Sequence, residues 1–104
     1  MLSLWFKSKK ISAILKIANE LYRQKRFDSA IKCYQRILKI DPTHFAAQAN
    51  LATALFECEN FADSIPELKQ VIKIDSINPW WYNYLSQAYQ KTGDFTLALD
   101  AGLQ

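Results

Sequence analysis

The amino-acid sequence predicts an all-α protein built as a stack of antiparallel helical hairpins. The main observation is a repeat. Phe27, Phe61 and Phe95 stand 34 residues apart, and other series keep the same step, among them Ile17, Leu51 and Leu85, and Ala30, Ser64 and Ala98. The second observation is the scarcity of residues that impose turns, since the 104 residues include only 2 glycines and 3 prolines. Helical repeats joined by short connections account for both observations.

Periodic apolar positions predict the first hairpin. Ile14, Ile17, Ala18 and Leu21 fall at i, i+3, i+4 and i+7, which predicts a helix over residues 9–24 with one apolar face. A matching series predicts a second helix over residues 27–40; it consists of Phe27, Ala30, Ile31, Tyr34 and Leu38. The two faces are expected to pack against each other, and the small Ala18 and Ala30 allow the backbones to approach closely.

The 34-residue step carries the same reasoning along the chain. It predicts further helices over residues 44–57, 61–74, 79–91 and 95–103. Pro66 lies close to the start of its helix, where the early N–H groups lack intrahelical partners, so its cost there is small. The Gly93-Asp94 pair predicts a turn between the last two helices. His44 follows Asp41-Pro42-Thr43 and is expected to start the third helix.

The period and the residue types resemble the tetratricopeptide repeat family. A large apolar residue precedes a small one in each first helix, as in Leu51-Ala52, and an aromatic opens each second helix. The resemblance covers residues 11–104, with repeats at 11–44, 45–78 and 79–104, the last one partial, after an apolar and basic extension at residues 1–10. It implies a right-handed superhelical stack with a concave and a convex side.

The resemblance also implies a binding surface. In this family the first helix of each repeat lines a concave groove, in which partners commonly lie as extended peptides. The matching positions here carry amide and aromatic side chains, namely Asn19, Tyr22, Asn50, Thr53, Phe56, Trp80, Asn83, Tyr84 and Gln87. Amides donate to and accept from a peptide backbone, and aromatics supply large contact areas. The alternative is that these residues only solvate a helix face or fill gaps between helices.

One activity of the family is not expected. Members that bind chaperone tails hold a terminal carboxylate with two asparagines and three cationic side chains. Asn19 and Asn50 match the two amides, but Leu15, Trp80 and Tyr84 occupy the three cationic positions. Because charge-assisted hydrogen bonds supply most of the strength of such recognition, we expect no carboxylate clamp.

Both ends of the array carry apolar side chains that need a partner. Leu97 and Leu103 lie in a last helix that stops before the repeat is complete, so a partner, a second copy or further chain is expected to cover them, unless a fragment boundary explains the end. At the other end Leu4, Trp5 and Phe6 precede three lysines. We favour an extension that packs over the first hairpin; peripheral contact with a membrane is the alternative.

Composition argues against several other functions. The net charge of +3 is small, and the basic residues are spread along the chain among acidic ones without forming a dense patch, so no nucleic-acid partner is expected. Cys33 and Cys58 stand alone and indicate reduced thiols in a reducing, cytoplasmic compartment. His44 is the single histidine, and no catalytic triad, phosphate loop or metal-ligand spacing is found. The chain is therefore not expected to be an enzyme or to hold a cofactor or metal.

The sequence predicts a non-catalytic adaptor that binds a peptide or helix of a partner protein in the groove. Two alternatives remain open at this point. One alternative is a structural subunit that assembles through its ends, for example within a membrane-associated complex, and the other is the amino-terminal docking domain of a longer protein.

Overall fold

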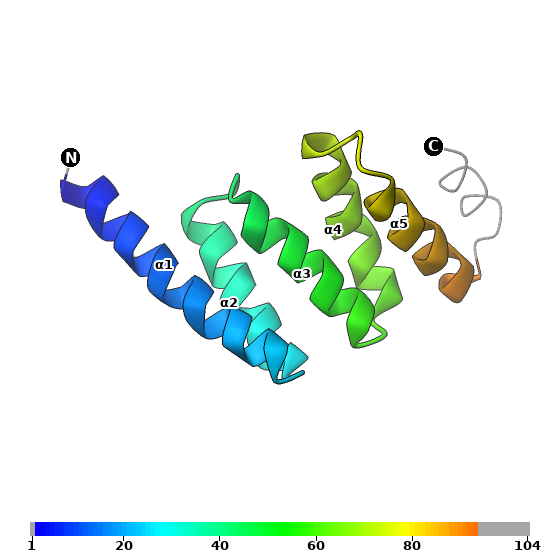
Figure 1. Ribbon diagram of the computed structural model, residues 1–104, viewed down its shortest axis with the longest axis horizontal. Helices are drawn as coiled ribbons and strands as arrows, with labels where there is room; N and C mark the ends of the chain where they lie inside the picture. Colours follow the sequence, from blue (N-terminus) through cyan, green and yellow to red (C-terminus); the bar gives the residue numbers. More distant parts are fainter. Residues whose placement is uncertain (1, 94–104) are drawn as a thin grey trace.

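The computed structural model describes residues 2–93, which form five helices and no strand within that range. They are α1 (Leu2–Arg23), α2 (Phe27–Ile40), α3 (Phe45–Glu57), α4 (Phe61–Ile74) and α5 (Pro79–Thr92). Figure 1 shows them as successive antiparallel helices arranged side by side along the long axis of the molecule. The all-α hairpin fold is confirmed, and four of the five helices begin and end within about one residue of the prediction. The predicted sixth helix, with Leu97 and Leu103, lies outside the described residues.

The first helix is longer than predicted. It begins at Leu2 rather than near residue 9, so the extension and the first helix of the repeat are one continuous helix of 22 residues. No glycine or proline interrupts this stretch, and helix formation therefore continues beyond the last core contact. Among residues 2–93 no helix combines the length and the apolar character needed to cross a bilayer.

Local signals fix where the later helices start. His44 precedes α3, and its Nδ1 accepts a hydrogen bond from the Ala47 backbone N–H at 3.1 Å. Asn78 precedes α5, and its Oδ1 accepts from the Trp80 backbone N–H at 3.0 Å. Pro79 then occupies the first turn, where its missing N–H has no cost. The expected role of His44 as a helix-start residue is confirmed.

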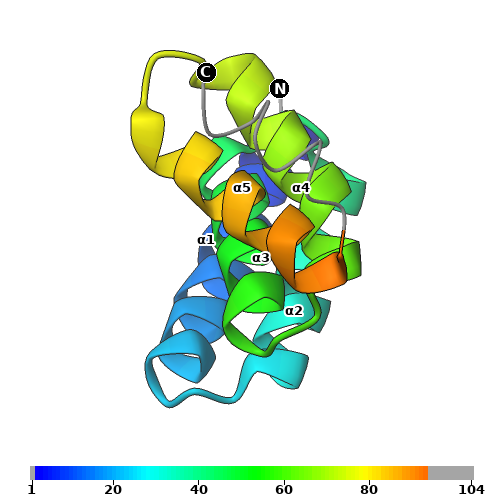
Figure 2. The same cartoon turned by 90° about the vertical axis from the view of Figure 1, so that its right-hand side faces the viewer.

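The core consists of two neighbouring clusters, one per hairpin interface. The first joins α1, α2 and the inner side of α3, and includes Ala18, Ala30, Tyr34 and Leu51. The second joins α3, α4 and α5, and includes Ala52, Leu68 and Leu85. Figure 2, viewed along the array, shows the second helices α2 and α4 on the same side of the first helices. Each hairpin thus buries part of its apolar surface between its own two helices and part against its neighbour, as expected of a helical repeat.

One predicted core residue is exposed. Ile17 was expected on the buried stripe of α1, but 57% of its surface is accessible, whereas Leu51 at the same repeat position is 3% accessible. The reason is the place of α1 in the array. Leu51 packs against the preceding hairpin, while no described element covers that side of α1.

Candidate peptide-binding groove

The first helices of the three repeats, α1, α3 and α5, are linked along one face by contacts between their side chains. An asparagine of α1 bonds to one of α3, and an aromatic ring of α3 packs on one of α5. The helices α2 and α4 pack behind them. All nine predicted groove residues lie on these three first helices, and none of them is fully buried. The sequence register therefore places them on the same three helices, and contacts between side chains join Asn19 to Asn50 and Phe56 to Tyr84.

Two asparagines meet at the α1–α3 end of this surface. Asn50 Nδ2 donates to Asn19 Oδ1 at 3.2 Å, and the Tyr34 hydroxyl donates to the same oxygen at 2.7 Å. Burial raises the pKa of Tyr34 to about 12, so this hydroxyl remains a donor at physiological pH. The Asn19 oxygen is used twice, which leaves the Asn19 amide N–H groups and the Asn50 oxygen for a ligand.

An aromatic cluster forms the α3–α5 end. The Phe56 and Tyr84 rings meet edge to face with centroids 4.8 Å apart, and Trp80 meets Tyr84 in the same way at 5.7 Å. Phe56 also contacts Phe61 at the start of α4, at 5.1 Å. Trp80 remains 58% exposed despite these contacts. The cluster therefore presents one accessible indole on a platform of rings that are already packed.

The other predicted residues are placed less uniformly. Asn83 and Gln87 are exposed and, with Trp80 and Tyr84, line a small hollow on α5. Tyr22 packs edge to face on Phe27 at 5.4 Å, which ties it to its own hairpin. The Thr53 hydroxyl donates to backbone carbonyls of its own helix, those of Ala49 and Asn50, both at 3.1 Å. Thr53 is therefore the weakest candidate for a ligand contact.

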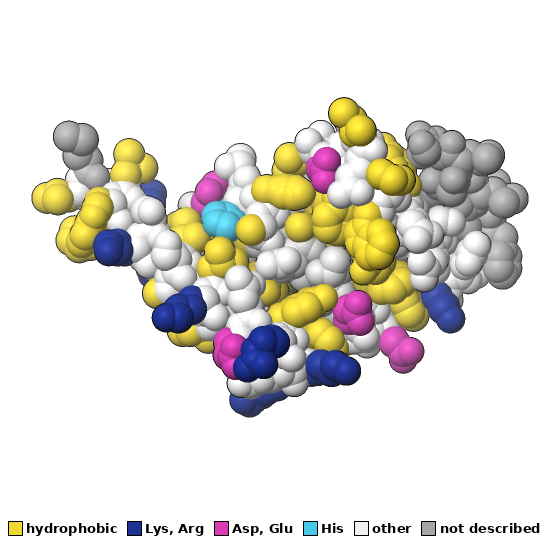
Figure 3. Space-filling view, viewed as in Figure 1, with side chains coloured by type: hydrophobic (Ala, Val, Ile, Leu, Met, Phe, Trp, Pro, Cys, Tyr) yellow, Lys and Arg dark blue, Asp and Glu magenta, His cyan; other side chains and the backbone are white. Residues whose placement is uncertain are grey.

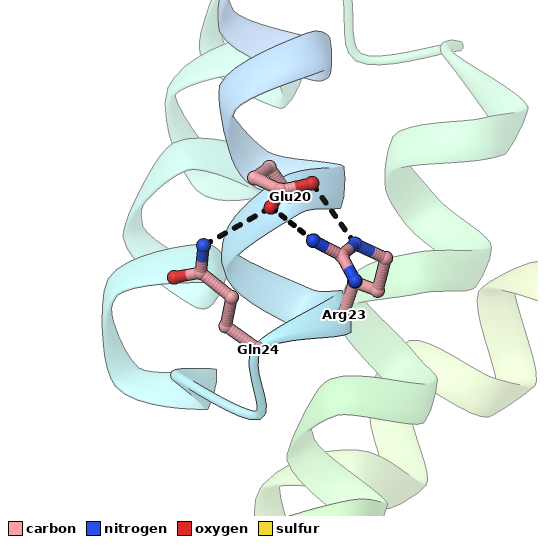
Figure 4. A network of polar contacts seen from close by, with 3 residues as sticks. All are labelled: Glu20, Arg23 and Gln24. Carbon is pink, nitrogen blue, oxygen red and sulfur yellow. Dashed lines mark hydrogen bonds and ion pairs between the residues drawn. The ribbon is translucent and has the colours of Figure 1, made fainter.

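The charge along this face is uneven. Figure 3 shows Lys and Arg side chains along α1 and its following turn, and hydrophobic side chains over α5 and the α4–α5 connection. Near the end of α1, Arg23 Nε donates to Glu20 Oε2 at 3.0 Å and Gln24 Nε2 donates to Glu20 Oε1 at 3.0 Å (Figure 4). The Arg23 guanidinium beside Glu20 lowers the pKa of that carboxyl. The ion pair therefore partly neutralises Arg23.

Two residues of this end were not singled out by the sequence. Trp81 stacks on Tyr84 with centroids 6.2 Å apart, and its Nε1 donates to Asp75 Oδ2 at 2.9 Å. Ile77 lies in the α4–α5 connection and is 92% exposed. The local repeat pattern holds a signal for Ile77, because the equivalent residue one repeat earlier is the polar Thr43.

The predicted contact residues at the start of α1 lie in two different surroundings. Leu4 lines a hollow with Ile11, Ile40 and His44, on the side of α1 that faces the α2–α3 connection. Trp5 and Phe6 contact each other at 5.0 Å and are 54% and 60% exposed. The expectation that the extension packs over the first hairpin is wrong, because these side chains extend from a helix that projects beyond it. Within residues 2–93 no group of His, Cys, Asp and Glu side chains is arranged to hold a metal ion.

Comparison with known proteins agrees with the repeat found in the sequence. The family model of the tetratricopeptide repeat matches residues 12–44. Stress-induced-phosphoprotein 1 of Caenorhabditis elegans is 24% identical over 90 residues, which cover 80% of this chain and 28% of that protein. The Hsp70-Hsp90 organising protein of Plasmodium falciparum is 28% identical over 97 residues, which cover 80% of this chain and 16% of that protein. The chain thus spans less than a third of the length of these curated relatives.

Solved structures support the same fold. The MamA RS-1 ArsTM double mutant superposes with a TM-score of 0.84 at 19% identity, over 88% of this chain and 51% of that one. The N-terminal domain of stress-induced protein-1 from C. elegans superposes with a TM-score of 0.77 at 22% identity, over 91% of this chain and 80% of that domain. The predicted resemblance to the tetratricopeptide repeat family and the predicted solenoid fold are confirmed.

Proposed function

We propose that this tetratricopeptide-repeat chain is a non-catalytic adaptor that binds a segment of a partner protein along α1, α3 and α5. The observation that carries the proposal is the accessible Trp80 on its aromatic platform, at one end of a face whose other end holds an amide pair with free hydrogen-bonding groups. The fold and the relatives support a role in protein–protein interaction. One relative is named for two chaperones, Hsp70 and Hsp90, but the proposal for this chain names no chaperone as the partner.

The two ends of the face favour different parts of a ligand. The amides of Asn19 and Asn50 suit a peptide backbone, which offers a donor and an acceptor at every residue. Trp80 and Tyr84 suit a large apolar side chain of the partner, and buried aromatic contacts commonly dominate the binding energy of an interface. We therefore propose a segment with one apolar anchor that lies against α5 and a main chain that crosses α3 towards α1.

The test is affinity capture from an extract of the source organism, with quantitative mass spectrometry. The groove variant is Asn50→Ala/Trp80→Ala, since both side chains project from the surface. A matched control, Gln70→Ala/Ile74→Ala, removes one amide and one exposed apolar side chain from α4. We expect a protein that wild type and control retain and the groove variant loses. Its binding segment should then bind with roughly micromolar Kd in calorimetry.

The same set of captured proteins with all three chains would contradict the groove proposal. Assembly through the ends of the array would then be the better hypothesis, together with a role as the docking domain of a longer protein. A partner lost equally with the control variant would point to the convex side, where α2 and α4 lie.

A further inference from the structure

We propose that the outer face of α1 binds the surface of an anionic lipid membrane. The outer face consists of Leu2, Trp5, Phe6, Lys9, Ala13, Lys16 and Ile17, flanked by Lys10. This inference is independent of the groove, which opens on a different side of the same helix.

Helix geometry places these residues together. Leu2, Phe6, Lys9, Ala13 and Lys16 follow one another at three- or four-residue steps, which keeps them on one side of a helix. All of them are exposed, whereas Ile14 and Ala18 on the opposite side are buried in the core. In Figure 1, α1 lies at one end of the array, and the other described helices all lie to one side of it; Figure 2 shows the same array from its other end. No described element covers the outer face.

The apolar side chains are large and concentrated in the first two turns. Leu2, Trp5 and Phe6 are 73%, 54% and 60% exposed, which is unusual for three such residues within one helix. Figure 3 shows hydrophobic side chains gathered around the start of α1, with Lys and Arg side chains further along the same helix. Tryptophan and phenylalanine beside leucine are the residues that insert into the boundary between lipid headgroups and acyl chains.

The charge of this segment matches an anionic surface. Residues 1–19 contain four of the thirteen basic residues of the chain and none of its ten acidic residues. Lys9 lies over the Trp5 ring, with Nζ 5.4 Å from the centroid, so its ammonium group stands next to the apolar patch. Lysine stems follow apolar surface while their charges reach a lipid phosphate. The pattern is that of a basic amphipathic helix lying on a membrane surface.

The repeat pattern disfavours a preceding helix as the occupant. On α3 the positions that receive the previous hairpin are Ala47, Leu51 and Ala54, all buried. On α1 the same positions carry Ala13, Ile17 and Glu20. Glu20 is charged, exposed and bonded to Arg23, so a helix cannot pack there as closely as on α3. The carboxylate lies one turn beyond Lys16, outside the part assigned to lipid.

The test is cosedimentation of the full chain with vesicles of phosphatidylcholine, with or without about one third phosphatidylglycerol. We expect binding to the anionic vesicles, little binding to the neutral ones, and release in about 1 M salt, where surface charges are screened. Lys9→Gln/Lys10→Gln should weaken binding on the order of tenfold. Trp5→Ser/Phe6→Ser should weaken it by roughly tenfold or more without changing the thermal melt, because both side chains are exposed.

Two controls make the result specific. Lys39→Gln/Lys73→Gln removes the same charge from exposed positions of α2 and α4 and should leave binding within roughly twofold. The groove variant Asn50→Ala/Trp80→Ala should also bind vesicles normally. Equal loss with the α2 and α4 lysines, or no preference for anionic vesicles, would overturn the proposal. A third result would also overturn it. If wild type does not bind vesicles but self-associates in sedimentation velocity, and Trp5→Ser/Phe6→Ser abolishes that self-association, the outer face binds a second copy instead.

Discussion

Tyr34 is the residue at which the hydrophobic core and the groove meet. Its ring is fully buried between α1 and α3, and its hydroxyl donates to Asn19 on the groove face at 2.7 Å. The hydrogen bond holds the Asn19 oxygen, and Asn50 donates to the same atom. A core residue thus orients two amides that are proposed to meet the ligand. Such a link keeps polar side chains in one arrangement before a ligand binds.

This arrangement predicts a dependence of stability on alkaline pH. The folded-state pKa of Tyr34, about 12, lies above the unfolded value near 10, so folding favours the protonated phenol. Its contribution is fully present below about pH 10 and is lost as the pH rises through about 12, with a loss on the order of 2 kcal/mol. Tyr34→Phe should cost about 1 kcal/mol at neutral pH through the lost hydrogen bond.

Urea denaturation of wild type and Tyr34→Phe at neutral pH and at about pH 11 measures both effects. The difference in unfolding free energy between the two proteins should shrink as the pH rises, because only wild type loses the Tyr34 contribution. The comparison cancels the titration of the other tyrosines and the lysines. A constant difference across this range would show that Tyr34 ionises equally in the folded and unfolded states.

The residues of the candidate groove also indicate one ligand that should not bind. Leu15, Trp80 and Tyr84 stand where a carboxylate clamp needs cations, and Arg23 on α1 is already paired with Glu20. A peptide that ends in Glu-Glu-Val-Asp should therefore bind with a Kd weaker than about 1 mM in calorimetry. Leu15→Lys/Tyr84→Arg should improve binding if the missing charges are the cause. Micromolar affinity of the wild-type chain would contradict this prediction.

The positions of the candidate groove residues could be predicted from the sequence, because the repeat register assigns each residue to one face of its helix. Asn19, Asn50 and Tyr84 were placed on the groove side by register alone, and the structure brings them to one surface. The contacts between them could not be predicted. The Thr53 hydroxyl turns back to its own helix, and Trp81 reaches Asp75, and both results depend on rotamers that spacing does not encode.

At the scale of the elements, the turn after each first helix uses one backbone conformation. Lys25, Glu59 and Gly93 stand 34 residues apart and have φ angles of 62°, 66° and 87°. After α1 the Arg26 N–H bonds the Leu21 carbonyl at 2.9 Å, and after α3 the Asn60 N–H bonds the Leu55 carbonyl at 2.9 Å. The left-handed residue closes each helix, a conformation that favours glycine.

Glycine at the first two of these positions should therefore stabilise the protein. Lys25→Gly and Glu59→Gly should each raise the free energy of unfolding by up to about 1 kcal/mol, since both side chains are exposed and only backbone strain is removed. Gly93→Ala should lower it by about 1 kcal/mol, although no atom lies within 4 Å of the added Cβ. Chemical denaturation measures all three.

The matched control is a glycine substitution within a helix, where the backbone has the ordinary right-handed conformation. Lys32→Gly, at an exposed position within α2, should destabilise by about 1 kcal/mol. Destabilisation by Lys25→Gly as large as that of the control would show that the left-handed turn carries no strain. The sequence predicted this turn at Gly93. The same left-handed conformation occurs at Lys25 and Glu59, where the residue type gives no sign of it.

The start of α1 could not be predicted from the apolar pattern. The pattern begins at Ile11 and Ile14, where contacts with α2 begin, but the helix continues to Leu2. Apolar periodicity reports burial rather than helicity, and residues 2–10 form helix without burying a face. The absence of a helix breaker before Ile11 is the one local signal for the longer helix, and it needs no core contact to act.

At the scale of the whole molecule, the stability of each hairpin depends on its neighbour. The 34-residue period was sufficient to predict the order and pairing of the helices, because each interface repeats the same residue types. It was not sufficient to predict exposure at the end of the array, where identical repeat positions have different surroundings. Ile17 and Leu51 are equivalent in register and opposite in burial.

This pair gives a direct test of the stacked architecture. Leu51→Ala removes a buried side chain at the interface between the first two repeats and should lower the free energy of unfolding by about 3 kcal/mol. Ile17→Ala makes a comparable truncation on the outer face of α1 and should cost less than about 1 kcal/mol. Denaturation of dilute protein isolates the intramolecular effect. If Ile17→Ala proves as costly as Leu51→Ala in dilute protein, some part of the same chain covers this side of α1. That result would remove the open face on which lipid binding depends, whereas the expected inequality leaves it accessible.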